Sequence, residues 1–191
     1  MSSTNRSDSR DTHISDYYVT PIHKIQDFLK EVIKYEPNIF KGYILDPCAG
    51  GDYKHRMSYP EALNQFKYNN IDSIDIREDS LAQVKTDYLT YECKNKYNTI
   101  ITNPPFNIAI NVIEKALDDV VNNGFVIMLL RLNFLGGKVR EDLWKQQMPK
   151  YIFVHNRRMS FTDDGKTDSI EYMHCVWQKD YYPEFTMLKV I

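Results

Sequence analysis

Apolar positions along this chain follow two spacings, one typical of amphipathic helices and one typical of buried strands. Apolar side chains recur three and four positions apart at 22–33 and 108–120, which predicts helices there, with further helix at 60–66 and within 131–150. Short β-branched or continuously apolar runs predict strands at 42–45, 71–74, 97–102, 125–130, 151–154 and 172–177. Strands that alternate with helices and end in a hairpin predict an α/β fold. We expect a three-layer sandwich with a mainly parallel, doubly wound sheet that ends in an antiparallel hairpin.

The domain organisation follows from where apolar residues are missing. Residues 1–15 contain almost none, so a disordered tail is expected there, followed by a single domain over 16–191. Of the 191 residues, 42% are hydrophobic and 26% charged, which is ordinary for a globular domain that buries a core. The sequence has no signal peptide and no apolar run long enough to cross a bilayer. We therefore expect a cytoplasmic protein without a membrane partner.

Charge and cysteine content narrow the chemistry further. The net charge of −2 means that any surface for nucleic acid must be a local basic patch. The three cysteines, Cys48, Cys93 and Cys175, lie far apart, with no CxxC spacing and no nearby pair of histidines. This spacing predicts neither a disulfide framework nor a metal site.

The stretch Thr99–Phe106, Thr-Ile-Ile-Thr-Asn-Pro-Pro-Phe, carries the sharpest chemical signal. Its β-branched residues favour a buried strand, and the two prolines must end that strand because they lack N–H donors. Asn103 is thereby presented at the carboxyl end of the strand, where ligands bind in open α/β sheets. A plain strand-to-helix loop is the alternative, but turn chemistry alone explains Asn-Pro-Pro-Phe poorly.

Other polar or small residues follow the earlier predicted strands. Asp46–Gly51, Asp-Pro-Cys-Ala-Gly-Gly, forms a small-residue turn that lets a ligand approach the backbone, and no Gly-Lys-Ser/Thr follows to make a P-loop. Asp75 ends the second strand, where nucleoside-binding sheets hold ribose hydroxyls. Asp87 follows a third short apolar piece. Thr20 is expected to cap the first helix, with Pro21 at its first position.

Taken together, these pieces resemble the S-adenosylmethionine-dependent amino-methyltransferases, most closely the DNA adenine-N6 methyltransferases of phages and bacteria. The matching pieces are Tyr18–Pro21, Asp46–Gly51, Asp75, Asp87 and Asn103–Phe106. The arginine-rich segment that ends in Phe161, with 165–168 and Val176-Trp177, is also similar to small phage members. The resemblance spans residues 16–178 and implies a Rossmann-like class I methyltransferase fold.

The resemblance implies S-adenosylmethionine as the cofactor and assigns roles to individual residues. Thr20 and Pro21 would border its methionine end, Asp75 would bind its ribose, and Asp87 would contact its adenine. The implied cofactor-binding residues are Tyr18, Thr20, Pro21, Asp46, Pro47, Cys48, Ala49, Gly50, Gly51, Asp75, Ile76, Asp87, Tyr88 and Asn103. Cys48 would line the turn through its backbone, since no base in the sequence is placed to activate it as a nucleophile. The implied catalytic residues are Asn103, Pro104, Pro105 and Phe106.

The chemistry of these four residues can be argued directly. The exocyclic amine of adenine is a poor nucleophile because its lone pair is delocalised into the ring. The side-chain oxygen of Asn103 and the carbonyl of Pro104 could each accept a hydrogen bond from one of its two N–H groups and so localise that lone pair. Phe106 would stack on the base, a contact worth roughly 1–3 kcal/mol. The base must be flipped out of a duplex or come from a single strand, and transfer would then be direct, without a metal.

The chain departs from larger DNA methyltransferases because it has no room for a separate target-recognition domain. Contacts to nucleic acid must then come from loops, which predicts short recognition or a partner for target recognition. The candidate residues are Arg131, Lys138, Arg140, Arg157, Arg158, Phe161 and Lys166. We expect DNA as the substrate, RNA as the alternative polymer, a monomer or homodimer, and the cytoplasm of a bacterial or phage-infected cell.

Two rival hypotheses remain open at this level. Methyltransferases that act on RNA adenine, a guanine amine or protein glutamine also use Asn-Pro-Pro followed by an aromatic residue. Phe106, in place of the tyrosine usual in guanine and glutamine methylators, favours adenine. The second rival is a catalytically silent binding subunit with the same fold, which should have lost part of Asp46–Gly51 or of Asn103–Phe106.

Overall fold

The computed structural model describes residues 18–161, 167 and 169–191. The predicted tail at 1–15 lies outside these residues. In chain order, the helices and strands are α1 (Ile22–Tyr35), β1 (Ile44–Asp46), α2 (Ser58–Gln65), β2 (Ile71–Asp75), β3 (Val84–Lys85), η1 (Tyr88–Thr90), β4 (Thr99–Thr102), α3 (Ala109–Asp119), β5 (Phe125–Arg131), η2 (Leu132–Leu135), η3 (Lys138–Arg140), α4 (Glu141–Gln146), β6 (Tyr151–Val154), β7 (Tyr172–Gln178) and β8 (Met187–Val190).

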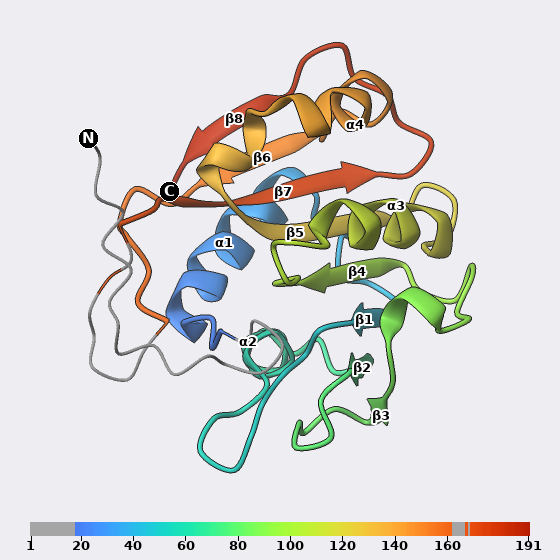
Figure 1. The fold of residues 1–191 in the computed structure, drawn as a ribbon, viewed down its shortest axis with the longest axis vertical. Coiled ribbons are helices and arrows are strands. Elements are labelled where there is room, and N and C mark those ends of the chain that lie inside the picture. The colour runs from blue at the N-terminus through green and yellow to red at the C-terminus, as the bar shows by residue number, and fades with distance from the viewer. Residues whose placement is uncertain (1–17, 162–166, 168) are drawn as a thin grey trace.

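The strands form one sheet in the order β3-β2-β1-β4-β5-β7-β6-β8, which Figure 1 shows from bottom to top. The first five strands in this order pair in parallel. β7 runs antiparallel to both β5 and β6, as predicted for the late hairpin. The predicted α/β architecture with a mainly parallel sheet is therefore confirmed.

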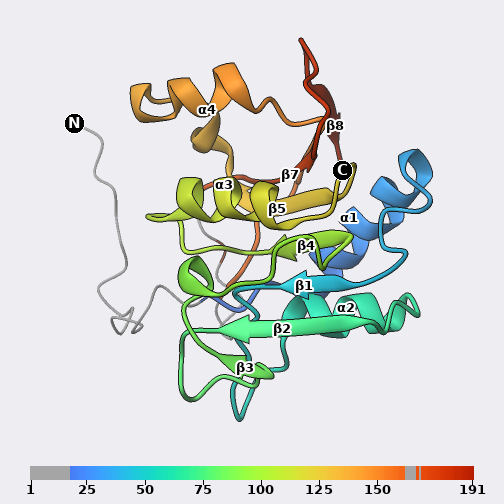
Figure 2. The same cartoon turned by 90° about the vertical axis from the view of Figure 1, so that its right-hand side faces the viewer.

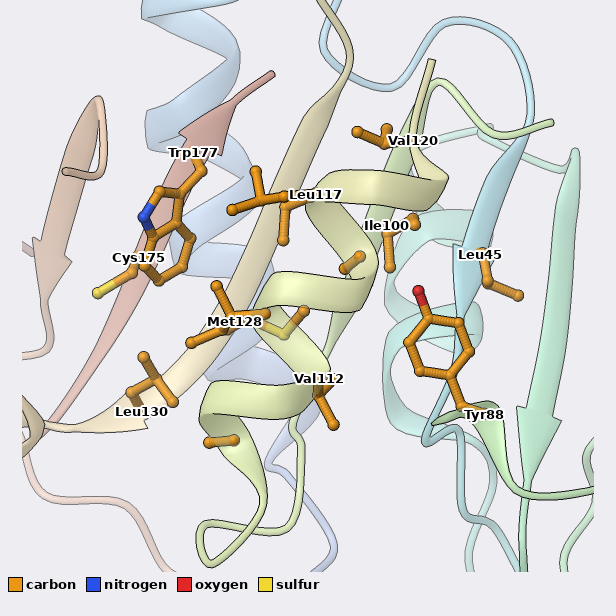
Figure 3. Close-up of a cluster of buried hydrophobic side chains, with 14 of the residues drawn as sticks. Leu45, Tyr88, Ile100, Val112, Leu117, Val120, Met128, Leu130, Cys175 and Trp177 are labelled. Atoms are coloured by element: carbon orange, nitrogen blue, oxygen red, sulfur yellow. The ribbon is translucent and has the colours of Figure 1, made fainter. Parts of the chain in front are cut away.

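Two apolar cores lie on the two faces of the sheet. One cluster packs α3 and Leu143 of α4 against inward-facing strand residues such as Ile100, Met128 and Trp177 (Figure 3). The second packs α1 and α2 on the opposite face, where Phe28 contacts Phe153. Figure 2 shows α3 and α4 on one side of the strands and α1 on the other. This is the three-layer arrangement expected when consecutive strands are buried on both faces.

Two details differ from the sequence predictions. The N-cap of α1 is Pro21 and no side chain caps the helix, so the prediction that Thr20 caps it is wrong. The Thr20 hydroxyl accepts a hydrogen bond from Asn103 instead. A strand that the pattern did not predict, β8, pairs in parallel with β6 at the edge of the sheet. Its exposed side chains have no apolar alternation for a sequence pattern to detect.

Among the described residues, no helix is both long and apolar enough to span a membrane.

Candidate functional site

Several of the predicted site residues meet at one edge of the sheet. β1, β2, β4 and β5 are parallel, and they end at Asp46, Asp75, Thr102 and Arg131 on that shared edge. A cavity of about 140 Å³ lies there. Its lining residues are Tyr18, Thr20, Pro47, Cys48, Ala49, Ser58, Tyr59, Asp75, Ile76, Arg77, Asp87, Tyr88, Leu89, Asn103, Pro105, Ile108 and Val112. Of the predicted cofactor-binding residues, Pro21, Asp46, Gly50 and Gly51 do not line it.

Asn103 is held with its amide oxygen available. Its Nδ2 donates a hydrogen bond of 3.1 Å to Oγ1 of Thr20, on the segment that leads into α1. Its Oδ1 is buried and accepts no hydrogen bond from any residue that the structure describes. Within the same described part of the chain, nothing donates to the carbonyl of Pro104 either. Two neighbouring acceptors thus lack donors in the described part of the chain, and for the buried Asn103 Oδ1 this is costly unless a ligand supplies one.

The small-residue turn after β1 depends on its two glycines. Gly50 and Gly51 have φ of 63° and 75°, the left-handed region that glycine adopts without strain. A Cβ on Gly51 would lie 2.9 Å from Cγ of Met57 and 3.1 Å from Cβ of Leu81, so a side chain would also displace these neighbours. The backbone N–H of Gly50 donates a 2.7 Å hydrogen bond to Oδ2 of Asp75. The turn after β1 and the end of β2 are therefore fixed to each other.

Asp75 is buried yet offers unused hydrogen-bonding capacity toward the cavity. Its Oδ1 accepts from the backbone N–H of Arg77 at 2.9 Å, and its Oδ2 accepts from Gly50. Each carboxylate oxygen has about two lone-pair sites, so both can accept one bond more. The residue is 6% exposed and lines the cavity. A rigid carboxylate of this kind is suited to holding a pair of vicinal hydroxyls.

Burial shifts the pKa values of Asp46 and Cys48. Burial raises the pKa of Asp46 to about 7, although the Thr102 hydroxyl, which donates to its Oδ1 at 2.6 Å, and the Cys48 N–H oppose the rise. Burial and the neighbouring carboxylates raise the pKa of the Cys48 thiol well above its ordinary value. A protonated thiol is a poor nucleophile. This supports the prediction that Cys48 only lines the turn.

Asp87 and Tyr88 take different positions beside the cavity. Asp87 caps η1, and its Oδ1 accepts a 2.9 Å hydrogen bond from the backbone N–H of Leu89. Tyr88 lines the cavity, but its hydroxyl donates to the buried Asp119 at 2.9 Å (Figure 3 labels Tyr88). Its polar atom thus anchors η1 to the end of α3 and is not directed at a ligand.

Phe106 belongs to an aromatic cluster next to the cavity. Its ring centroid lies 6.3 Å from that of Tyr18 and 6.1 Å from that of Tyr172. Phe161 packs edge-on against Tyr172 at 4.8 Å and against Tyr18 at 5.9 Å. The guanidinium carbon of Arg131 lies 4.4 Å from the centroid of Phe106, as in a cation–π contact. Stacking of a base on that face of Phe106 would therefore require Arg131 to share or leave it.

The other residues predicted to contact nucleic acid are dispersed. Arg140 packs over the ring of Phe134 at 4.4 Å, within the core on the α3 face, and Lys138 precedes it in η3. Arg157 and Arg158 are exposed beyond β6, and Arg158 Nε lies 3.3 Å from Oε1 of Glu171. Lys166 lies outside the described residues. Of the predicted nucleic-acid contacts that the structure describes, only Arg131 and Phe161 belong to or contact the aromatic cluster.

Sequence reasoning missed a buried polar chain that starts at the cavity wall. The hydroxyl of Tyr59 lies 3.0 Å from Nε2 of His174, and Nδ1 of His174 lies 2.8 Å from Nε2 of His155. Burial lowers the pKa of His155 to about 3 and that of His174 well below its usual range, so both rings are neutral at pH 7. These three hydrogen-bonded side chains connect α2, β7 and the end of β6. No periodicity in the sequence could have signalled it, since its members come from three separate elements.

Comparison with known proteins identifies the architecture. No protein-family model and no curated protein matches this chain. Among solved structures, it is similar to a protein named as a class I S-adenosylmethionine-dependent methyltransferase from Listeria monocytogenes, with a TM-score of 0.64, 14% identity and 91% of this chain covered. A protein named as an RNA methyltransferase from Pyrococcus horikoshii gives 0.62 and 12% over 86% of this chain. The type IIG restriction endonuclease BpuSI gives 0.63 and 12% over 94%.

The chain spans 65%, 85% and 27% of the lengths of these three proteins, respectively. The share differs because the match to the endonuclease is confined to a part of that much longer chain. All three matches cover at least 86% of this chain. The chain therefore has the class I, Rossmann-like methyltransferase fold that its sequence predicts.

Proposed function

We propose that this protein is an S-adenosylmethionine-dependent methyltransferase that methylates the N6 amine of adenine in DNA. The observation that carries the proposal is the hydrogen bonding of the Asn103 side chain. Its Nδ2 donates to Thr20, while its Oδ1 is buried and has no donor among the residues that the structure describes. An amide oriented in this way offers an acceptor, which a planar amine with two N–H groups needs. The adjacent Pro104 carbonyl supplies a second acceptor on a backbone that proline makes rigid.

The residues around the cavity fit the cofactor that this fold implies. The free lone pairs of Asp75 suit ribose hydroxyls, and the apolar side chains of Leu89, Ile108 and Val112 suit the faces of an adenine ring. Asp87 also lines the cavity, and its carboxylate would contact a polar edge of that ring. The positive-φ glycines keep the turn after β1 compact beneath the site. S-adenosylmethionine, when bound, would supply an electrophilic methyl group on its sulfonium.

The protein's own part in the transfer is positioning and electrostatic stabilisation. Asn103 Oδ1 and the Pro104 carbonyl would each accept a hydrogen bond from one N–H group of the amine and so direct the nitrogen lone pair at the methyl group. The proton that the methylated amine loses would pass to solvent water. Both acceptors are fixed before the substrate arrives, so little reorganisation is needed at the moment of reaction. Neither Cys48 nor the neutral histidines are needed as nucleophile or base in this scheme. The base would enter as a flipped-out or single-stranded nucleotide.

A comparison of substrates tests the proposal. Purified protein is incubated with tritiated S-adenosylmethionine and, separately, with single-stranded DNA, duplex DNA, RNA of the same sequence and a mixture of proteins. We expect label in DNA, recovered as N6-methyldeoxyadenosine after digestion to nucleosides. Label confined to RNA would replace DNA by RNA in the proposal. Label in guanine or glutamine would refute the choice of adenine, and no label in any polymer would favour the silent binding subunit.

A further inference from the structure

The two outermost strands of the sheet differ in how they are protected from pairing with another chain. β3 is the outermost strand on one side, and it consists of only Val84 and Lys85. A very short strand with a charged side chain is a poor template for a further strand. β8 is the outermost strand on the other side, and within the residues that the structure describes it pairs only with β6 (Figure 1).

Exposed apolar side chains are concentrated around β8. Of the large hydrophobic side chains that are exposed in the described part of the chain, six lie within 181–190, and each of the six is at least 44% exposed. They are Tyr181, Tyr182, Phe185, Met187, Leu188 and Val190. Single exposed apolar residues are ordinary, whereas a contiguous group marks a surface that another molecule covers. Residues 181–191 are called the β8 surface below.

Lys189, the one charged residue of β8, does not guard this surface. Its ammonium donates to Oε2 of Glu31 at 2.7 Å and to the hydroxyl of Tyr35 at 3.2 Å, and both partners belong to α1. The charge is therefore paired on the α1 face of the sheet and is not left free to repel a further strand. Leu188 and Val190 alternate with Lys189, so their exposed side chains lie on the other face.

The backbone of β8 also offers hydrogen-bonding groups on its outer side. In the pairing with β6, the N–H of Ile191 donates to the carbonyl of Val154 at 2.8 Å, so the odd-numbered residues point toward β6. Because successive residues of a strand point to alternate sides, the N–H and C=O groups of Thr186, Leu188 and Val190 point outward. A row of such groups is a template for an additional strand.

We propose that a second copy of this chain covers the β8 surface, with the two β8 strands paired antiparallel about a two-fold axis. A two-fold pairing uses the same patch on both copies, which is the commonest assembly of identical chains. Residues 181–191 carry one acidic and one basic side chain, Glu184 and Lys189. The surface therefore has no net charge that would select an acidic or basic partner, and its apolar side chains and outward backbone groups complement those of an identical strand.

Charge also selects the register of this pairing. Two registers place outward-facing backbone groups opposite one another over most of β8, one centred on Leu188 and one centred on Lys189. The second places Lys189 directly opposite Lys189 of the other copy, and like charges opposite one another are unfavourable. The first places Leu188 opposite Leu188 and Met187 opposite Lys189. The register centred on Leu188 is therefore favoured.

This arrangement keeps the two candidate sites apart. β4, which leads to Asn103, is separated from β8 by β5, β7 and β6. β8 runs parallel to β6 and hence to β5, because β5 and β6 are both antiparallel to β7. Antiparallel pairing of two β8 strands would thus direct the sites to opposite sides of the joined sheet. Each copy should act alone, so a variant that separates the copies should keep the rate of methyl transfer per chain, and a lower rate per folded chain would contradict this arrangement.

The mass of the protein in solution tests the proposal without any measurement of catalysis. Size-exclusion chromatography with light scattering, over a dilution series, should give the mass of two chains of 22.6 kDa each at high concentration. Leu188→Lys should weaken the association at least about a hundredfold, because the substitution enters the interface twice and places like charges opposite one another. Val84→Lys, on the outermost strand at the other side of the sheet, is the matched control and should remain dimeric.

Cysteine substitutions test the register. Two residues that form a hydrogen-bonded antiparallel pair have Cα atoms about 5.5 Å apart, which is within the range of a disulfide. Leu188→Cys should therefore give a covalent dimer when its two thiols are oxidised with diamide. Val190→Cys lies opposite Thr186 in this register and should give no more covalent dimer than the wild type. A covalent dimer from Val190→Cys alone would overturn the register.

The remaining outcomes decide the proposal as a whole. A wild-type protein that has the mass of one chain at every concentration would overturn it. A dimer that persists in Leu188→Lys would place the interface elsewhere and also overturn it. The melting midpoint of Leu188→Lys at high dilution should equal that of the wild type, since the side chain is exposed in a single chain. Loss of the dimer together with a lowered midpoint at that dilution would assign Leu188 a structural role and count against the proposal.

Discussion

Asp46 gives a prediction that depends on a single buried carboxyl group. It lies at the end of β1, with no exposed surface, beneath the turn that borders the cavity. Its Oδ1 accepts from Thr102 Oγ1 at 2.6 Å and from the N–H of Cys48 at 3.3 Å, whereas its Oδ2 has no partner among the described residues. Asp46→Asn keeps the shape and the accepting oxygen but removes the charge.

The sign and size of the effect follow from the raised pKa. Burial raises the pKa of Asp46 from 3.8 to about 7, so between these values the folded protein holds a proton that the unfolded chain has released. The free energy of unfolding therefore falls as the pH rises through this window, by about 1.4 kcal/mol per unit. Over about three units the burial of this group costs up to about 4 kcal/mol, an upper bound because structural relaxation reduces it.

The assay is urea unfolding of the wild type and Asp46→Asn between pH 4.5 and 8.5 in the absence of cofactor. The advantage of the variant in free energy of unfolding should be smallest at pH 4.5, near the lower end of this window, and should grow by several kcal/mol up to pH 8.5. Asp72→Asn is the control with the opposite sign. Lys96 and Tyr97 hold the pKa of Asp72 below its usual range, so this variant should lose stability above pH 4 and little below it. A constant difference between wild type and Asp46→Asn across the range would refute the reasoning.

Three further substitutions test other parts of the account. Thr20→Val removes the acceptor of Asn103 Nδ2 and should slow methyl transfer up to about tenfold with little change in the thermal midpoint; an unchanged rate would show that this hydrogen bond does not position the amide. Asp75→Asn replaces an oxygen that accepts a backbone N–H, so calorimetry should find S-adenosylmethionine bound at least about tenfold more weakly; undiminished affinity would remove Asp75 from the cofactor site. Leu129→Ala in the core on the α1 face should cost about 2–5 kcal/mol in urea unfolding, and a loss below about 1 kcal/mol would mean that this core is loosely packed.

The fold was predictable where apolar spacing is strong. The helical spacing at 108–120 and the apolar run at 125–130 correspond to α3 and β5, since both lie at the centre of the sandwich, where burial dictates residue type. β8 was not predictable, because Met187, Leu188 and Val190 are exposed on an edge strand and no burial pattern marks them. Local rules thus succeed in the core and fail at the edge of the sheet.

The candidate site was predictable where neighbours in sequence act together. This holds for the turn after β1 and for Asn103 with its two prolines. In each, the site residues follow one another in the sequence, so the local backbone already implies their position. The contact of Arg131 with Phe106 joins distant segments, so only the folded sheet creates it. Such long-range contacts leave no trace in periodicity or composition.

The acceptor role of Asn103 is the central claim, and the rate of methyl transfer tests it most directly. Wild type and Asn103→Ala are compared with adenine-containing DNA under single-turnover conditions, at cofactor concentrations that saturate each protein, with binding measured separately. Loss of a preorganised electrostatic contact of this kind lowers rates about 10²–10³-fold in other enzymes, and we expect a loss of that size here. An Asn103→Ala variant that forms N6-methyladenine at the wild-type rate would contradict the account.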